Sequence, residues 1–307
     1  MKDKILKIAE RVMLITFLII LIIFQNNHEL WLDELDWSIG IVESESLKDV
    51  IKTVLATGEN LPLFYIILFI IKSLFGYSSE WILTFLSATI FTIIGILGIL
   101  KISDKLLGRK NRIYTIFFIF VSYSIMSQCG WQLRPYGLLF CCSAWMLYFY
   151  LEKLEDEKKS NYFKYTILMI LLMYSHWFGV LISLVYALVD FILFLNKKIN
   201  WKFIFSYIIA GLAFLPSFIV LLILHKNDIS NYGVEVPNII NLIYIFRFLG
   251  GNLFLNAIIL LVTIFAVFIK KEKNRDIKIL SYVMILLIAI TYIYSRFINP
   301  ERFYNKK

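Results

Sequence analysis

The sequence predicts an all-α protein, a polytopic helical bundle that crosses a membrane about nine times. Composition is the first observation, since 60% of the 307 residues are hydrophobic and only 17% are charged, with a mean hydropathy of +0.77. Pattern is the second, since apolar runs of roughly 15 to 22 residues alternate with short polar breaks. Soluble domains carry more charge and shorter apolar runs. We therefore expect one integral-membrane domain over residues 1–307.

The apolar runs define the expected spans, which are about as long as the hydrocarbon core of a bilayer is thick. They lie near residues 8–25, 81–100, 113–128, 136–151, 164–177, 179–195, 203–224, 253–269 and 279–295. The continuous run 165–195 is too long for one ordinary span. It should form a hairpin that turns at residues 175–179.

The breaks predict the orientation, because cytoplasmic loops of membrane proteins are enriched in Lys and Arg. Five breaks hold 21 of the 31 Lys and Arg residues: 1–11, 101–112, 152–164, 196–202 and 270–278. Placing these breaks in the cytoplasm makes all nine spans alternate, with the N-terminus inside and the C-terminus outside. The basic residues are spread over the breaks rather than gathered on one face, which argues against nucleic acid as a partner.

The first external loop, about residues 26–80, is expected to form helices that lie on the membrane surface. Apolar residues recur at helical spacing between 33 and 56, and the apolar segment 61–76 is too short for an ordinary span. A third surface helix is expected at 237–251. Eight of the 22 acidic residues fall between Glu29 and Glu59, among them the adjacent Asp33 and Glu34.

Ionisable residues at the edge of the hydrocarbon are costly, so each is a functional candidate. On the predicted topology the external face collects several of them, including Asp33, Glu34, Arg134, His176 and Arg302. A carboxylate can accept a proton from an attacking hydroxyl, and arginine binds phosphate through paired N–H groups. Arg134 also stands at a predicted helix N-terminus, which favours an anion. Sugar transfer from a lipid phosphate needs both kinds of group.

Each candidate has a simpler interpretation as well. Asp33 would cap a surface helix, Arg134 would extend to lipid headgroups, and His176 would satisfy a backbone group. Asp190, near the cytoplasmic end of its span, is interpreted as interfacial. The three cysteines lack metal-type spacing and the external loops lack a D-x-D pair, so no metal and no cofactor are expected.

Four segments, taken in order, resemble the GT-C superfamily of membrane glycosyltransferases. They are LWLDELDWS, LPLFYIILFIIKSLFGYSSEWILTFLSA, GWQLRPYGLLFCCSAWMLYFYL and LLMYSHWFGVLISLVYAL. The resemblance covers about residues 28–195. It is closest to the bacterial branch similar to dolichyl-phosphate-mannose protein mannosyltransferases and the aminoarabinose transferase of lipid A. The segment ERFY, near residue 302, is similar to an R-Y motif met later in such proteins.

The resemblance implies a GT-C-like bundle in the bacterial plasma membrane with its active site on the external face. Such enzymes transfer a sugar from a polyprenyl phosphate, such as undecaprenyl phosphate, to an external lipid, glycan or protein. Asp33 matches the first-loop aspartate, which acts as general base or orients the acceptor, and Glu34 is its usual neighbour. Arg134 with Tyr136 matches a motif near the carrier phosphate, and Arg302 would be a second phosphate contact. His176 joins them as a substrate-binding candidate.

The chain also departs from this family. Gln132 stands where many relatives have Glu, residues 59–61 lack the usual basic side chain, and relatives run longer than Lys307. Two other hypotheses therefore stay open. An inactive, truncated relative is one. A transporter or flippase of a lipid-linked sugar is the other, and it predicts ionisable residues near mid-membrane and inverted repeats. The sequence instead places its charges at one face and shows no repeat, which favours the enzyme.

Overall fold

The computed structural model describes residues 2–27, 29–30, 32–58, 60–76, 80–122, 124–156, 158–224 and 275–293. Every regular element within these ranges is a helix. The expected span at 253–269, the expected surface helix at 237–251 and the candidate Arg302 lie outside them.

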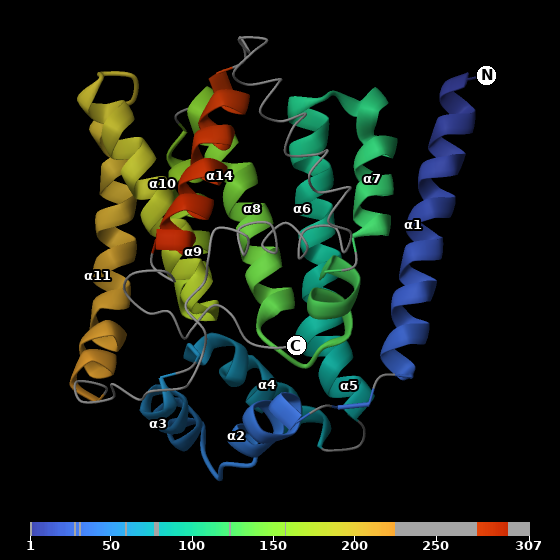
Figure 1. Ribbon diagram of the computed structural model, residues 1–307, viewed down its shortest axis with the longest axis vertical. Coiled ribbons are helices and arrows are strands. Elements are labelled where there is room, and N and C mark those ends of the chain that lie inside the picture. The colour runs from blue at the N-terminus through green and yellow to red at the C-terminus, as the bar shows by residue number, and fades with distance from the viewer. Residues whose placement is uncertain are drawn as a thin grey trace.

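Most helices run side by side along the long axis of the molecule (Figure 1). They are α1 (Lys2–Asn26), α5 (Glu80–Thr84), α6 (Ile90–Leu106), α7 (Arg112–Val121), α8 (Tyr136–Glu155), α9 (Lys159–Ser175), α10 (Trp177–Leu195), α11 (Trp201–Leu224) and α14 (Arg275–Ile293). Three shorter helical segments connect some of them: η2 (Phe85–Thr89) and η4 (Ile125–Trp131) are wide π-helical turns, and η3 (Arg109–Asn111) is a 3-10 turn.

Within the described residues, three helical stretches are long and apolar enough to cross a membrane. They are Glu80–Leu106, Trp177–Leu195 and Trp201–Leu224. The pair Arg109–Val121 and Ile125–Trp131, bent by 74°, adds a fourth if the two form one span. The described part of the chain is thus all-helical with several candidate spans, and the number nine stays a prediction.

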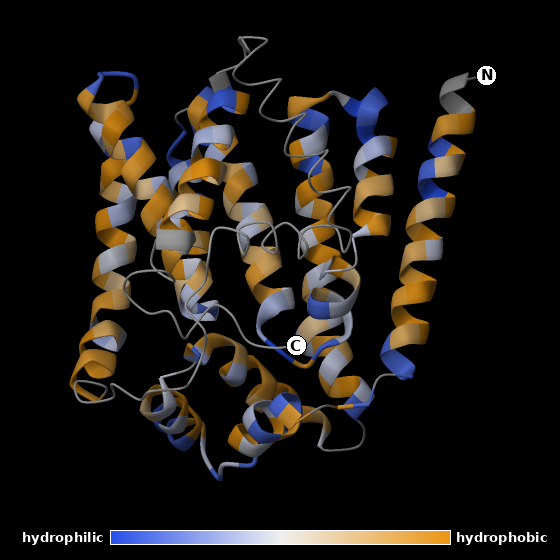
Figure 2. Cartoon of the chain, in the orientation of Figure 1, coloured by the Kyte–Doolittle hydropathy of each residue, from blue (hydrophilic) through white to orange (hydrophobic). Residues whose placement is uncertain are grey.

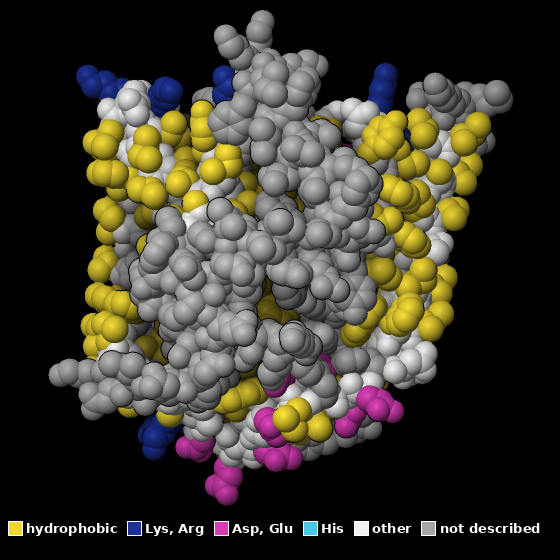
Figure 3. Space-filling view, in the orientation of Figure 1, with side chains coloured by type: hydrophobic (Ala, Val, Ile, Leu, Met, Phe, Trp, Pro, Cys, Tyr) yellow, Lys and Arg dark blue, Asp and Glu magenta, His cyan; other side chains and the backbone are white. Residues whose placement is uncertain are grey.

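The described side chains along both sides of the face in Figure 3 are mainly apolar, and most turns of the long helices are coloured as hydrophobic in Figure 2. Leu212 and Ile223 of α11 are 62% and 69% exposed, and Leu184 of α10 is 60% exposed. Exposing this much apolar surface to water is unfavourable, whereas lipid tails solvate it without cost. The surface is therefore compatible with a bilayer around the bundle.

Shorter helices lie across one end of the bundle (Figure 1), which we call the helix-capped end. They are η1 (Glu34–Ile39, π-helical), α2 (Gly40–Val42), α3 (Leu47–Thr57) and α4 (Pro62–Phe75). The expectation of one continuous helix from 33 to 56 is wrong. The helix breaks at residues 43–46 because Ser46 acts as an N-cap, its Oγ accepting the Asp49 N–H at 3.2 Å. A serine at this position starts a new helix more readily than it continues an old one.

Charged side chains separate toward the two ends. On the face shown in Figure 3, Lys and Arg gather along the upper edge, where the loops after α6, α8 and α10 lie, and Asp and Glu gather at the helix-capped end. We call the upper edge, formed by residues 101–112, 153–164 and 196–202, the basic end. Its loops are the ones that the sequence places in the cytoplasm.

The main apolar core joins the helix-capped end to the bundle. Tyr65 and Leu68 of α4 are buried in one cluster with Leu133, with Leu138 of α8 and with Leu172 of α9. A smaller cluster joins α1, α6 and α7 through Phe17, Leu21, Ile96, Leu100, Ile116 and Ile119. The surface helices are therefore anchored by burial of their apolar faces rather than by loop connections alone.

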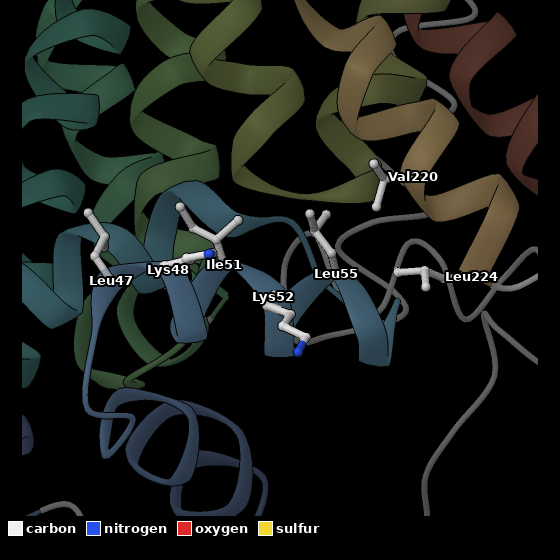
Figure 4. A pocket seen from close by; sticks show the side chains of 7 residues that line it. All are labelled: Leu47, Lys48, Ile51, Lys52, Leu55, Val220 and Leu224. Atoms are coloured by element: carbon white, nitrogen blue, oxygen red, sulfur yellow. The ribbon is translucent and has the colours of Figure 1, made fainter.

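A groove of about 510 Å³ lies between α3 and the nearby end of α11 (Figure 4). Its lining is apolar apart from two lysines and comprises Leu47, Lys48, Ile51, Lys52, Leu55, Val220 and Leu224. No residue that the sequence proposes for chemistry lines it, so the candidate site lies elsewhere.

The hairpin between α9 and α10 yields a sharp stability prediction at Gly179. A Cβ on Gly179 would collide with the carbonyl oxygen of Leu172 and lie 2.7 Å from its carbonyl carbon, and neither backbone atom can move cheaply. We expect Gly179→Ala to cost about 3 kcal/mol and to lower the apparent unfolding temperature by several degrees, measured by differential scanning fluorimetry in detergent. Gly211→Ala on α11 is the control, because a Cβ there meets nothing within 4 Å. Equal unfolding temperatures for the two variants would contradict the close packing of this hairpin.

Candidate active site

The segment that leads into α8 is held by hydroxyl groups from neighbouring helices. η4 ends at Trp131, and its last carbonyl groups need partners from outside the turn. Thr89 Oγ1 donates to the carbonyl oxygen of Gly130 at 2.7 Å, and Thr92 Oγ1 donates to that of Cys129. A Cβ on Gly137 would lie 2.7 Å from the Ala88 carbonyl oxygen, so the first turn of α8 packs directly against this support.

Two side chains of η1 hydrogen-bond to the backbone N–H and C=O groups of Leu133. Glu34 Oε1 accepts the Leu133 N–H, and Ser38 Oγ donates to the Leu133 carbonyl oxygen. Glu34, Ser38 and Leu133 are all buried. Because buried backbone groups are costly without partners, these two hydrogen bonds fix the backbone immediately before Arg134.

Arg134 then meets Asp33, which lies 101 residues earlier in the chain. Arg134 Nη1 donates to Asp33 Oδ2 at 2.8 Å. The Asp33 side chain keeps 25% of its surface exposed and that of Arg134 keeps 16%, so both can still be reached from outside. An arginine and a carboxylate are thus paired at the helix-capped end, as the sequence expected them to converge on one face.

Aromatic rings connect the Asp33–Arg134 pair to the hairpin between α9 and α10. The Arg134 guanidinium lies 5.4 Å from the ring centre of Tyr136, and the Tyr136 ring lies 5.6 Å from that of His176. His176 in turn stacks on Phe178 at 5.3 Å. Asp33, Arg134, Tyr136 and His176 therefore form one continuous cluster, which we call the Asp33–Arg134 site.

His176 is fixed by its backbone surroundings. It separates α9 from α10, and its Nδ1 accepts the Phe178 N–H at 3.1 Å, so the proton of the neutral ring sits on Nε2. The next residue, Trp177, donates from Nε1 to the carbonyl oxygen of Gly58 at 2.9 Å. This bond ties the hairpin to the end of α3 and brings His176 beside the first loop.

Two groups of the site have shifted proton affinities. Burial alone would lower the pKa of Arg134, but Tyr136 and the Asp33 carboxylate outweigh it and raise that pKa above its ordinary value. Burial, and after it the positive charge of Arg134, lower the pKa of His176 from 6.5 to about 4. The site therefore carries a charged arginine and a neutral histidine near pH 7.

The lowered pKa of His176 predicts a pH-dependent stability. Between pH 6.5 and about pH 4 the unfolded chain binds a proton at this residue and the folded chain does not, so folding stability falls as pH drops through this window. The full effect is about 2 kcal/mol once partial exposure is taken into account. We expect His176→Asn, whose side chain can still cap α10, to lose less stability than the wild type between pH 7 and pH 4 in thermal unfolding. Parallel pH profiles for the two proteins would contradict a neutral His176.

The structure places the other candidates differently. Glu34 is fully buried and accepts the Leu133 N–H, and its assignment to substrate binding stays a prediction. Asp190 is fully buried beside Lys153, near the end of α10, and its interfacial depth stays a prediction. Ser38, Thr89 and Thr92 were missed, because hydroxyl residues on apolar helices carry no distinguishing signal. Among the described residues, no three His, Cys, Asp or Glu side chains are grouped as a metal site requires.

Comparison of the chain with models of protein families, with curated proteins and with solved structures finds no match.

Proposed function

We propose that this chain is a membrane glycosyltransferase that moves a sugar from a polyprenyl-phosphate carrier to an external acceptor. The observation that supports it best is the 2.8 Å pairing of Asp33 with Arg134, which joins a candidate base to a candidate phosphate ligand. The resemblance of residues 28–195 to the GT-C superfamily points the same way. On this proposal the fold is a GT-C-like bundle of about nine spans in the bacterial plasma membrane.

The proposed reaction divides the work between these two residues. The acceptor hydroxyl attacks the anomeric carbon of the sugar, and Asp33 accepts the hydroxyl proton. The bond between that carbon and the phosphate oxygen breaks, and the polyprenyl phosphate leaves with the bonding electron pair. Arg134 stabilises the negative charge that develops on the leaving phosphate. Arriving donor phosphate would compete with Asp33 for the guanidinium, which frees the carboxylate for the acceptor.

Nearby residues have supporting roles in this scheme. Tyr136 holds the guanidinium against its ring face, which directs the N–H groups sideways. His176, neutral and protonated on Nε2, supplies a donor for a sugar hydroxyl or a phosphate oxygen. Arg302, a second proposed phosphate contact, lies outside the described residues. The acceptor is a lipid, a glycan or a protein at the external face, with the N-terminus in the cytoplasm.

The proposal is tested with the purified wild-type protein in lipid vesicles that contain polyprenyl phosphate carrying a radiolabelled sugar. Extracts of bacterial lipids, glycans and proteins serve as acceptors. We expect label to move into one acceptor class while polyprenyl phosphate is released in equal amount. Intact donor after prolonged incubation with every acceptor class would contradict the enzyme proposal.

A flippase of the lipid-linked sugar is the second candidate, and it predicts ionisable residues near mid-membrane. The buried Lys153 and Asp190 lie toward the ends of α8 and α10 instead, so they do not favour it. The same vesicles separate the two functions. A flippase moves the intact labelled lipid from one leaflet to the other, whereas the transferase breaks the bond between sugar and phosphate.

A further inference from the structure

A buried ion pair lies far from the Asp33–Arg134 site, toward the basic end of the bundle. Lys153 is close to the last residue of α8, and Asp190 lies in the second half of α10. Both side chains are 0% exposed, and Lys153 Nζ lies 3.5 Å from Asp190 Oδ2. A lysine near a helix end would normally extend its ammonium group to the lipid headgroups. This one turns inward instead.

The ammonium group of Lys153 sits among aromatic rings that come from three helices. The distances from Nζ to the ring centres are 3.5 Å for Tyr165, 4.4 Å for Phe203, 5.0 Å for Tyr150 and 5.3 Å for Tyr207. A cation within about 6 Å of a ring centre is attracted by the negative face of the ring, and more strongly where water is excluded. Four such rings offset part of the cost of burying the charge.

Asp190 is satisfied by the same aromatic residues. Its Oδ1 accepts the hydroxyl of Tyr150 at 2.6 Å, and its Oδ2 accepts that of Tyr207 at 2.7 Å. The hydroxyls of Tyr165 and Tyr207 are themselves 2.8 Å apart. The network therefore links α8, α9, α10 and α11, each of which contributes at least one polar group.

We propose that Lys153 and Asp190 form a charge-neutral lock that holds α8, α9, α10 and α11 together at the basic end of the bundle. Separately, α8 would carry an uncompensated cation and α10 an uncompensated anion, each costly in a low-dielectric interior. Together the two charges cancel inside the aromatic cage. The lock also fixes how α8 and α10 are aligned along their axes. Sliding either helix by one turn would move the two charges about 5 Å farther apart.

The lock connects the same two helices that carry part of the Asp33–Arg134 site. α8 begins at Tyr136 and holds Lys153 some 17 residues later, about 26 Å along the axis. α10 begins next to His176 and holds Asp190 toward its other end. Tyr136 and His176 thus meet at one end of this helix pair, and Lys153 and Asp190 meet at the other.

A double-mutant cycle tests the lock without any assay of activity. Lys153→Met and Asp190→Asn are each expected to lower the apparent unfolding temperature in lipid nanodiscs by about 10 °C, because each leaves one buried charge unpaired. The double variant, which removes both charges, should recover most of that loss. The control is the exposed pair Asp156 and Lys158, whose side chains are 46% and 72% exposed. Asp156→Asn and Lys158→Met should each shift the unfolding temperature by only about 1 °C.

If the single variants do not fold, the yield of folded protein in the membrane fraction replaces the unfolding temperature. The double variant should then accumulate while each single variant does not. Tyr207→Phe is a milder change that keeps the ring and removes one donor to Asp190, and it should lower the unfolding temperature by a few degrees, about a third of the effect of Asp190→Asn. Two outcomes would overturn the proposal. One is that the single variants are as stable as the wild type, and the other is that the double variant is no more stable than the less stable of the two single variants.

Discussion

Asp33→Asn is expected to reduce sugar transfer by a factor of about 10² to 10⁴, the usual contribution of a positioned general base. The asparagine keeps the size of the side chain and an oxygen that can accept from Arg134, but it does not take up a proton. Folding should therefore be preserved, and the loss should appear in the rate of the bound complex rather than in donor binding.

Asp36 provides the matched control for this experiment. It lies on the same π-helical segment, η1, and it is exposed rather than paired with Arg134. Asp36→Asn should transfer sugar at a rate close to that of the wild type. Equal losses in the two variants would show that the acidic surface as a whole matters and that Asp33 has no individual role.

Arg134→Ala is expected to reduce transfer by a factor of about 10² to 10³, because it removes a charged donor aimed at the leaving phosphate. The Leu133 peptide is held by Glu34 and Ser38 and not by the arginine side chain, so the backbone should keep its path. Arg134→Lys should recover only part of the activity, since an ammonium group lacks the paired N–H geometry that binds phosphate.

The arginine variants also need a structural control. Thermal unfolding and far-UV circular dichroism should show both proteins folded, because Asp33 keeps 25% of its side chain exposed and water can solvate it when its partner is lost. Full transfer activity in folded Arg134→Ala would remove this residue from the proposed mechanism.

The sequence could predict that Asp33 and Arg134 lie on the same face, although it could not predict their contact. Hydrophobic periodicity and the positions of the basic loops assign each residue to one end of the bundle. The 2.8 Å pairing depends on the hydrogen bonds between Leu133 and the side chains of Glu34 and Ser38, and these join segments nearly 100 residues apart. Nothing in the local sequence encodes such a contact.

Other features could not be predicted because neighbouring residues share the same chemistry. Asp33 and Glu34 are adjacent carboxylates, yet the turn of η1 leaves one beside Arg134 and buries the other. Lys153 and Asp190 each resemble an ordinary interfacial residue until the packing of α8 against α10 brings them together. The break at Ser46 was missed for a different reason, since the apolar periodicity continues across it and only the N-cap marks the end of the first helix.

The most direct test of the central claim, that Asp33 and Arg134 act as one site for sugar transfer, is a double-mutant cycle measured on kcat/KM. The wild type, Asp33→Asn, Arg134→Ala and the double variant would be compared in vesicles containing the labelled polyprenyl-phosphate sugar. Residues that work as a unit show strongly non-additive losses of kcat/KM. The kcat/KM of the double variant should therefore be only slightly below that of the less active single variant. A shared site would be contradicted if the double variant lost kcat/KM by the product of the two single-variant factors. It would also be contradicted if either single variant kept the wild-type kcat/KM.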